Sequence, residues 1–338
     1  MATTTQEPLI LYHYPFSPYA RRLIWYLKIR NIPYYQCLQP PILPRPDLSS
    51  HLSLNYRRIP LLAHGGDLYL DTRLILNLLD TLYPPSVPLT AEQKAIEQLL
   101  SVLTTSTNLF FKAAELLPAS LPAMKDPKFL KDRSSFFPGG GVKKTREERE
   151  LSRAEALVEV QNSVRLLEES ILSDGRDWVL GGREPTRADV EGVWVVHWLL
   201  TLPKPHDEHA VDRGVINKER YPRTMGWVNR FDEFVNGLEG REGRVVKGEE
   251  AAGMVLGGKK GGDNIGVDER DPVVKVQGLK KGDVVEVYPT DSGSGFRDRG
   301  RLVGVGEREV VWENEKGVRV HAPRVGFRVV GVKGRASL

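Results

Sequence analysis

Apolar positions recur along the chain with a spacing that differs from one region to the next. Up to Leu82, short apolar runs alternate with two helical patterns, in the order strand, helix, strand, loop, two strands, helix. This order predicts a compact α/β unit. The predicted strands cover residues 9–13, 34–38, 61–63 and 68–70, and the predicted helices begin at Ser17–Pro18 and near Thr72.

From Ala91 onward the apolar positions repeat at helical spacing over roughly 150 residues. An irregular, glycine- and lysine-containing insert at 118–144 interrupts them. The pattern therefore predicts an all-helical second domain. Its helices are predicted at 92–117, at 146–172, from Thr186 onward and at 221–236.

A third region begins after residue 240. Residues 240–266 are rich in glycine, lysine and glutamate, and they predict a flexible linker. Short β-branched runs separated by Gly, Pro and Asp turns follow, and this rhythm predicts a small antiparallel barrel or sandwich. The runs are 273–279, 283–288, 301–305, 309–313, 318–322 and 327–332.

The chain is thus predicted to be a multidomain protein. The predicted domains are an α/β domain at 8–84, an all-helical domain at 91–239 and a small all-β, barrel-like domain at 267–334, with the linker at 240–266 before the last one.

Composition narrows the classes of function. With 40% hydrophobic and 27% charged residues, the 338-residue chain has the composition of a globular protein.

No apolar run approaches the ~20 residues of a membrane helix and no signal-peptide pattern is present, so a cytoplasmic location is expected. Cys37 is the single cysteine, which excludes an intrachain disulfide and argues against a metal site. The net charge of +4 makes nucleic-acid binding unlikely as a main role.

Three segments, in a specific order, carry a resemblance to a known family. Residues 16–22 resemble the start of the first helix of the glutathione transferase superfamily. Residues 58–62, followed by 70–75, are similar to the V-P-x-L and E-S-x-A-I pair of that family. Residues 178–181 and 185–189 are similar to its F-L-x-G and P-T-x-A-D signature. The resemblance covers roughly residues 8–240 and leaves the predicted barrel outside.

The sequence also departs from the pattern of the family. Residues 55–58 stand where an N-P-x-G segment is usual, and the insert is longer than in common classes. Its residues 128–133 are similar to those of fungal members.

The resemblance implies a thioredoxin-like first domain that binds glutathione. Pro60 would then follow a cis peptide bond, so that Ile59 offers its backbone to the cysteinyl part of glutathione. Thr72 would bind the γ-glutamyl carboxylate at a helix N-terminus, and Asp71 would assist with the amine. Arg58 precedes the proline and could reach the glycyl carboxylate.

A hydroxyl group would activate the glutathione thiol. Ser17 occupies the position where the superfamily places a Ser or a Cys, and it is preferred here over Tyr14, the position of the phenol in the tyrosine-using classes. Both residues also have an ordinary structural interpretation, as a helix cap and as a packed aromatic residue. Thr186 and Asp189 are expected to form a capping box that serves folding.

These expectations favour an enzyme of detoxification or secondary metabolism. It would use glutathione as a co-substrate, without a metal, to attack a small hydrophobic electrophile or to assist an isomerisation or elimination. The resemblance further implies a homodimer. An alternative remains open: a non-catalytic, transferase-fold binding or regulatory protein whose C-terminal barrel mediates protein interaction.

Overall fold

The computed structural model of the chain describes residues 7–136, 145–202, 214–261 and 265–332. Its first unit has the predicted α/β order. The elements are β1 (Leu9–His13), α1 (Pro18–Ile29), β2 (Tyr35–Leu38), α2 (Pro46–Ser49), β3 (Leu61–His64), β4 (Asp67–Leu70) and α3 (Thr72–Leu82). β1 pairs in parallel with β2 and antiparallel with β3, and β3 forms a hairpin with β4.

The second unit is helical. Its elements are α4 (Ala91–Thr105), α5 (Leu109–Glu115), α6 (Pro122–Lys125), α7 (Pro127–Ser134), α8 (Arg146–Leu166) with the π-helical turn η1 (Leu167–Ile171), α9 (Arg187–Leu200) and α10 (Pro222–Asn236). No helix in the described ranges is long and apolar enough to cross a membrane.

Two predictions for this unit need correction. The single helix predicted at 92–117 is broken into α4 and α5, because the Thr107 hydroxyl accepts the Leu109 N–H (3.2 Å) and so starts a new helix. The insert predicted to be irregular contains α6 and α7, each of which begins with a proline at its first position. Residues 137–144 of the insert lie outside the described part of the chain.

Residues 240–261 of the segment predicted as a flexible linker are ordered and packed, and residues 262–264 lie outside the described part of the chain. Within it, β5 (Arg244–Val245) pairs with β2, and α11 (Gly248–Gly257) follows. The glycines after α11 allow a close approach to the β3–β4 turn: a Cβ on Gly258 would lie 2.4 Å from the Gly65 carbonyl carbon, and Lys259 accepts the Gly66 N–H (2.8 Å). At Gly258, glycine therefore permits close packing of two backbones.

The C-terminal region is β-rich, as predicted, except at its start. The predicted strand at 273–279 is the helix α12 (Pro272–Gln277), because the Asp271 carboxylate caps its N-terminus and Gly278 ends it with φ +67°. The strands are β6 (Val284–Pro289), β7 (Asp298–Val305), β8 (Glu309–Glu313), β9 (Arg319–Pro323) and β10 (Phe327–Gly331).

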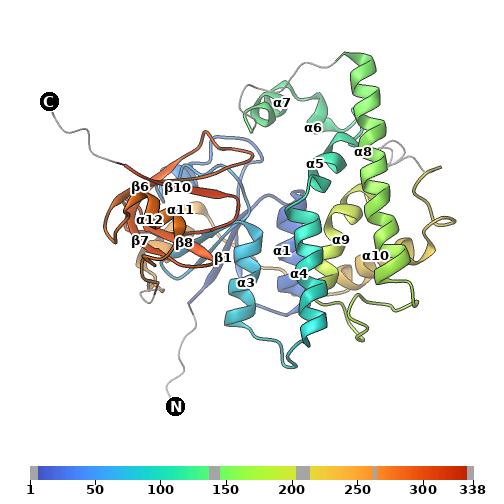
Figure 1. The fold of residues 1–338 in the computed structure, drawn as a ribbon, viewed down its shortest axis with the longest axis horizontal. Helices are drawn as coiled ribbons and strands as arrows, with labels where there is room; N and C mark the ends of the chain where they lie inside the picture. Colours follow the sequence, from blue (N-terminus) through green and yellow to red (C-terminus); the bar gives the residue numbers. More distant parts are fainter. Residues whose placement is uncertain (1–6, 137–144, 203–213, 262–264, 333–338) are drawn as a thin grey trace.

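These strands continue the sheet of the first unit. β9 pairs in parallel with β4, which gives one ten-stranded sheet in the order β10-β6-β7-β8-β9-β4-β3-β1-β2-β5. One apolar core also spans both parts, with Leu61 and Leu68 beside Trp312 and Val320. The C-terminal β-rich region is therefore not the separate barrel that the sequence predicts. Figure 1 shows the strands gathered on one side of the molecule and the helices α8 and α10 on the other.

Candidate functional site

A cavity of about 370 Å³ lies where the two units meet the C-terminal strands. This volume lies in the usual range for small-molecule sites. Its walls come from the start of α1, the segment before β3, the start of α3, helix α5, the insert and the β6–β7 loop. The lining includes every residue that the sequence suggested for glutathione: Tyr14, Ser17, Arg58, Ile59, Pro60, Asp71 and Thr72.

Ser17 lies at the N-terminus of α1 and is 2% exposed. Its hydroxyl oxygen accepts the Ala20 N–H (3.3 Å), so the hydroxyl hydrogen is not used by this bond. A ligand thiolate at this position would receive a hydrogen bond from Ser17 and would also face the positive end of the α1 dipole.

Tyr14 lies three residues before Ser17, between β1 and α1, and it lines the same cavity. Its ring packs on Phe16, with 4.7 Å between the centroids. Its hydroxyl receives a hydrogen bond from the guanidinium of Arg133 in α7 (3.3 Å). Both candidate hydroxyls thus line the cavity, and the phenol of Tyr14 has a cationic neighbour that the sequence did not indicate.

The segment before β3 presents a free backbone edge. The Ile59–Pro60 peptide bond is cis, as predicted. Within the described residues, the N–H and C=O of Ile59 have no hydrogen-bond partner. Such groups suit a ligand that brings a peptide of its own.

Asp71 and Thr72 open helix α3. Asp71 has φ +66°, an unfavourable conformation for a residue with a side chain, and its carboxylate binds the backbone N–H (3.0 Å) and the guanidinium of Arg73 (2.9 Å). Burial alone would raise the pKa of the Asp71 carboxyl, but Arg73 outweighs burial and holds the pKa below its ordinary value. Asp71 therefore carries its charge at neutral pH.

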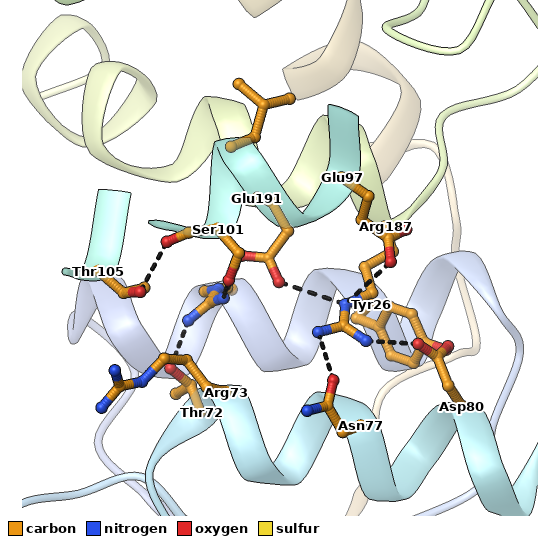
Figure 2. A network of polar contacts seen from close by, with 12 residues as sticks. Tyr26, Thr72, Arg73, Asn77, Asp80, Glu97, Ser101, Thr105, Arg187 and Glu191 are labelled. Atoms are coloured by element: carbon orange, nitrogen blue, oxygen red, sulfur yellow. Dashed lines mark hydrogen bonds and ion pairs between the residues drawn. The ribbon is translucent and has the colours of Figure 1, made fainter. Parts of the chain in front are cut away.

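Behind Thr72 lies a buried polar network, shown in Figure 2. Arg22, which is fully buried, donates to the Thr72 hydroxyl, to Ser101 (3.3 Å) and to Glu191. Because the Thr72 oxygen accepts from Arg22, its own hydrogen is free to donate to an anion at the N-terminus of α3. Arg22 thereby fixes the Thr72 hydroxyl as a donor.

Arg58 is paired with the C-terminal region. Its guanidinium binds the carboxylate of Asp291 in the β6–β7 loop through two bonds (2.7 and 3.3 Å). The ring of Phe327 lies beneath the same guanidinium, 5.6 Å away. The suggested contact of Arg58 with the glycyl carboxylate would therefore have to compete with Asp291.

An aromatic and aliphatic wall faces these polar groups. It is supplied by α5 and the insert, and it is formed by Phe110, Phe111, Ala114, Leu117, Met124, Phe129, Leu130 and Phe136. The apolar half of the cavity is suited to a hydrophobic second ligand beside the polar half.

Thr186 and Asp189 lie away from the cavity, in the core of the helical unit. The Asp189 carboxylate accepts the Thr186 N–H (2.8 Å), and it also accepts from Val179 (2.8 Å) and from the indole of Trp227 (2.9 Å). Asp189 is fully buried, so these bonds tie α9 to α10 and to the preceding loop. Both residues are placed for folding.

Several residues of the cavity escaped the sequence analysis. Arg57 is 1% exposed, binds Asp132 (2.8 Å) and stacks on Phe136 at 3.7 Å. Arg133 and Asp291 come from segments more than 70 residues farther along the chain, and no local pattern marks either of them. In the sequence, the adjacent arginines Arg57 and Arg58 are the one signal that could have pointed to these cavity residues.

The described part of the chain offers neither a reactive cysteine nor a cluster of metal-binding side chains. Burial raises the pKa of the Cys37 thiol to about 12, so this cysteine stays protonated. No three side chains of His, Cys, Asp or Glu among the described residues gather to hold a metal ion.

Two family models match the chain. The model for the N-terminal domain of glutathione S-transferase matches residues 11–87, and a domain of unknown function (DUF7962) matches residues 112–239. No curated protein matches in sequence.

Several solved structures are similar. A GST-like protein from Pseudomonas syringae has a TM-score of 0.64 at 22% identity, covering 96% of this chain and 100% of that chain. A Tau class glutathione S-transferase from mango (Mangifera indica) has a TM-score of 0.50 at 17% identity, covering 73% and 96%. A beta-etherase from Sphingobium sp. has a TM-score of 0.50 at 16% identity, covering 69% and 99%.

The structural similarity to the Pseudomonas syringae protein covers more of the chain than the family resemblance expected from the sequence. At 96% of this chain, the alignment with the Pseudomonas syringae protein includes the C-terminal strands, which the sequence had placed outside the resemblance. These similarities concern the fold, since all three identities are below 25%. The chain has an N-terminal domain of the glutathione S-transferase type within a GST-like fold that continues into the C-terminal strands.

Proposed function

We propose that the protein is a glutathione transferase-like enzyme that activates the glutathione thiol. One observation carries the proposal: the seven residues suggested for glutathione come from three separate segments, and all of them line one cavity. Ser17 and Tyr14 offer hydroxyls to a thiolate, Ile59 offers its backbone, and Thr72 offers a donor at a helix N-terminus.

The apolar wall supports a hydrophobic electrophile as the second substrate. Phe110, Phe111 and Phe129 line the cavity on the side of α5 and the insert. In the reaction, the thiolate sulfur would donate its electron pair to the electrophilic carbon of the substrate and form a thioether. In a substitution the substrate would then release a leaving group, and in an addition it would take up a proton. The Ser17 or Tyr14 hydroxyl would stabilise the thiolate before the attack.

The non-catalytic alternative receives less support. It requires the C-terminal strands to act as a separate interaction module, whereas β9 is paired with β4 and Asp291 lines the cavity. The contribution of these strands to the cavity favours the enzyme.

A titration of bound glutathione tests the proposal. The ultraviolet absorbance of the thiolate is followed against pH for the wild type, Ser17→Ala and Tyr14→Phe. We expect a bound thiol with a pKa at least about one unit below the ~8.5 of a free thiol, and a loss of this depression in one of the two variants.

Thr90→Ala is the matched control for Ser17→Ala. It removes the N-cap of α4, where the Thr90 hydroxyl accepts the Gln93 N–H (3.2 Å), at a site outside the cavity. It should cost similar stability and leave the thiol pKa unchanged. Absence of glutathione binding at millimolar concentration would reject the proposed function.

A further inference from the structure

The β6–β7 loop reaches from the C-terminal strands into the candidate glutathione site. β6 ends at Pro289 and β7 begins at Asp298, and two residues of the loop between them, Asp291 and Ser292, line the cavity. A region that follows the helical unit in the sequence thus supplies side chains to the same wall as Arg58 and Asp71.

The loop is held in place by contacts with three other segments. The Gly293 N–H donates to the carbonyl of Phe136 in the insert (2.7 Å), and the Thr290 N–H donates to Gly326 (2.9 Å). Gly293 has φ +78°, and a Cβ at this position would lie 3.2 Å from the Cγ of Arg57. The position of Asp291 is therefore set before any ligand binds.

The carboxylate of Asp291 lies among charges of both signs. It forms two bonds with Arg58, and 53% of its side chain remains exposed. Asp71 and Asp291 both line the cavity. Burial lowers the pKa of the Arg58 guanidinium, but the charges of Tyr56, Asp291 and Asp71 hold it above its ordinary value.

The two carboxylates differ in what they can still bind. Asp71 is 12% exposed on its side chain, and both of its oxygens are bonded to Arg73. Among the described residues, Asp291 bonds Arg58 alone; it lines the cavity, and half of its side-chain surface is exposed. Asp291 is accordingly the carboxylate with room for a further donor.

The chemistry of a γ-glutamyl group specifies that donor. Its α-carboxylate and its α-ammonium group are attached to the same carbon. If the carboxylate lies at the N-terminus of α3 near Thr72, the ammonium group lies next to it and requires an anionic acceptor in the same corner.

We propose that Asp291 binds the α-ammonium group of the γ-glutamyl residue, with the charge of Asp71 nearby, so that the C-terminal region completes the glutathione site. This inference rests on the proposed function. It makes Asp291 a specificity residue that distinguishes ligands with the ammonium group from ligands without it.

The test compares glutathione with its analogue that lacks the α-amino group. Dissociation constants for both are measured by calorimetry with the full-length wild type, with Asp291→Asn and with Asp291→Glu. We expect the wild type to prefer glutathione about tenfold, and Asp291→Asn to lose most of this preference because a charge-assisted bond is lost. Asp291→Glu, which keeps the carboxylate, should retain part of it.

The ratio of the two constants isolates the ammonium group. Asp291→Asn also releases Arg58, which would change the affinity for the carboxylates, but both ligands carry the same carboxylates. Asp268→Asn is the control, since Asp268 also pairs with an arginine, Arg270 (3.1 Å), at a site outside the cavity. Asp268→Asn should keep the wild-type ratio.

Two outcomes would overturn the proposal. If Asp291→Asn keeps the wild-type ratio of the two dissociation constants, even with an equal loss of affinity for both ligands, Asp291 acts only on the structure or on the carboxylates. If the wild type binds both ligands equally well, no residue of the site recognises the ammonium group. If the wild type binds neither ligand, the proposed function itself fails; if the wild type binds glutathione and the ratio does not change, only this inference fails.

Discussion

The thioredoxin-like unit is joined to its two neighbours in two different ways. Toward the helical unit, the junction is a buried ionic network in which Arg22 meets Glu191 and Arg187 meets Asp80 (Figure 2). Toward the C-terminal strands, the junction is a continuous sheet with a shared apolar core.

The two junctions also differ in what they do for the site. The ionic network stands behind Thr72 and orients one hydroxyl. The sheet junction carries a whole loop into the cavity and includes one buried histidine: His321 bonds Glu309 (2.8 Å), lies 3.4 Å from Asp67 and stacks on Tyr69. The ionic network thus orients a side chain of the site, because ion pairs depend on geometry, whereas the sheet junction is held mainly by apolar burial and strand pairing.

Breaking the ionic junction should have the largest effect. Glu191→Ala leaves the fully buried guanidinium of Arg22 without its counter-charge, and we expect the free energy of unfolding to fall by about 3–5 kcal/mol. Denaturant unfolding measures the change. The double variant Arg22→Met/Glu191→Leu removes both charges and should cost much less; equal costs for the single and double variants would contradict the role of the pair.

Weakening the sheet junction should cost somewhat less. Leu68→Ala removes a fully buried side chain of β4 from the shared core, with an expected loss of about 3 kcal/mol. Because the core is shared, hydrogen exchange should show reduced protection in β1–β4 and in β6–β9 together. Leu167→Ala, in the core of the helical unit, is the control and should leave the sheet protected. Exchange that increases in β1–β4 alone would speak against one cooperative sheet.

A buried carboxyl makes the sheet junction dependent on pH. Asp298 accepts the Asn55 N–H (2.6 Å), and burial raises the pKa of its carboxyl to about 7. Since the unfolded pKa is ~3.9, the stability that it contributes is fully present below that value and is lost as pH rises toward 7.

Asp298→Asn should remove this dependence. Between pH 5.5 and 8, the wild type should lose about 2 kcal/mol relative to the variant. Thermal unfolding of both proteins over this range gives the difference. Parallel pH profiles would show that Asp298 is ionised in the folded protein across the whole range.

The smallest free-energy change is expected for Thr72, the residue at which the ionic junction contacts the candidate glutathione site. Thr72→Val keeps the shape of the side chain and removes the hydroxyl that Arg22 orients, so affinity for glutathione should fall about tenfold, or about 1.4 kcal/mol. Thr81→Val, on the exposed side of the same helix, is the matched control. Equal affinities of the two variants would exclude Thr72 as a ligand.

Two local sequence signals have a different meaning in the structure from the one predicted. Residues 273–279 read as a strand because of their β-branched residues, yet Asp271, Pro272 and Gly278 mark the ends of a helix within the same segment. The glycines near residue 258 read as flexible, although glycine also permits two backbones to touch, as happens at Gly65. Composition does not distinguish these two uses of glycine.

Local sequence signals were enough to predict the elements of the first unit and the residues at their ends. These signals are local features of the chain: the helix caps Ser17 and Asp71, the proline at 60 and the spacing of apolar residues. The two caps stabilise their helices through hydrogen bonds to backbone groups two or three residues away. The same local signals placed the candidate site at the start of α1, before β3 and at the start of α3.

The residues that enclose that site come together through long-range contacts. Arg133 and Asp291 enter the cavity through a helical insert and a strand loop far along the chain, and the pairing of β4 with β9 joins segments about 250 residues apart. The pairing of β4 with β9 buries a shared apolar core and gives the free edge of β4 a partner strand. Any apolar strand of suitable length could do both. The partner in such a pairing is therefore absent from the local sequence pattern.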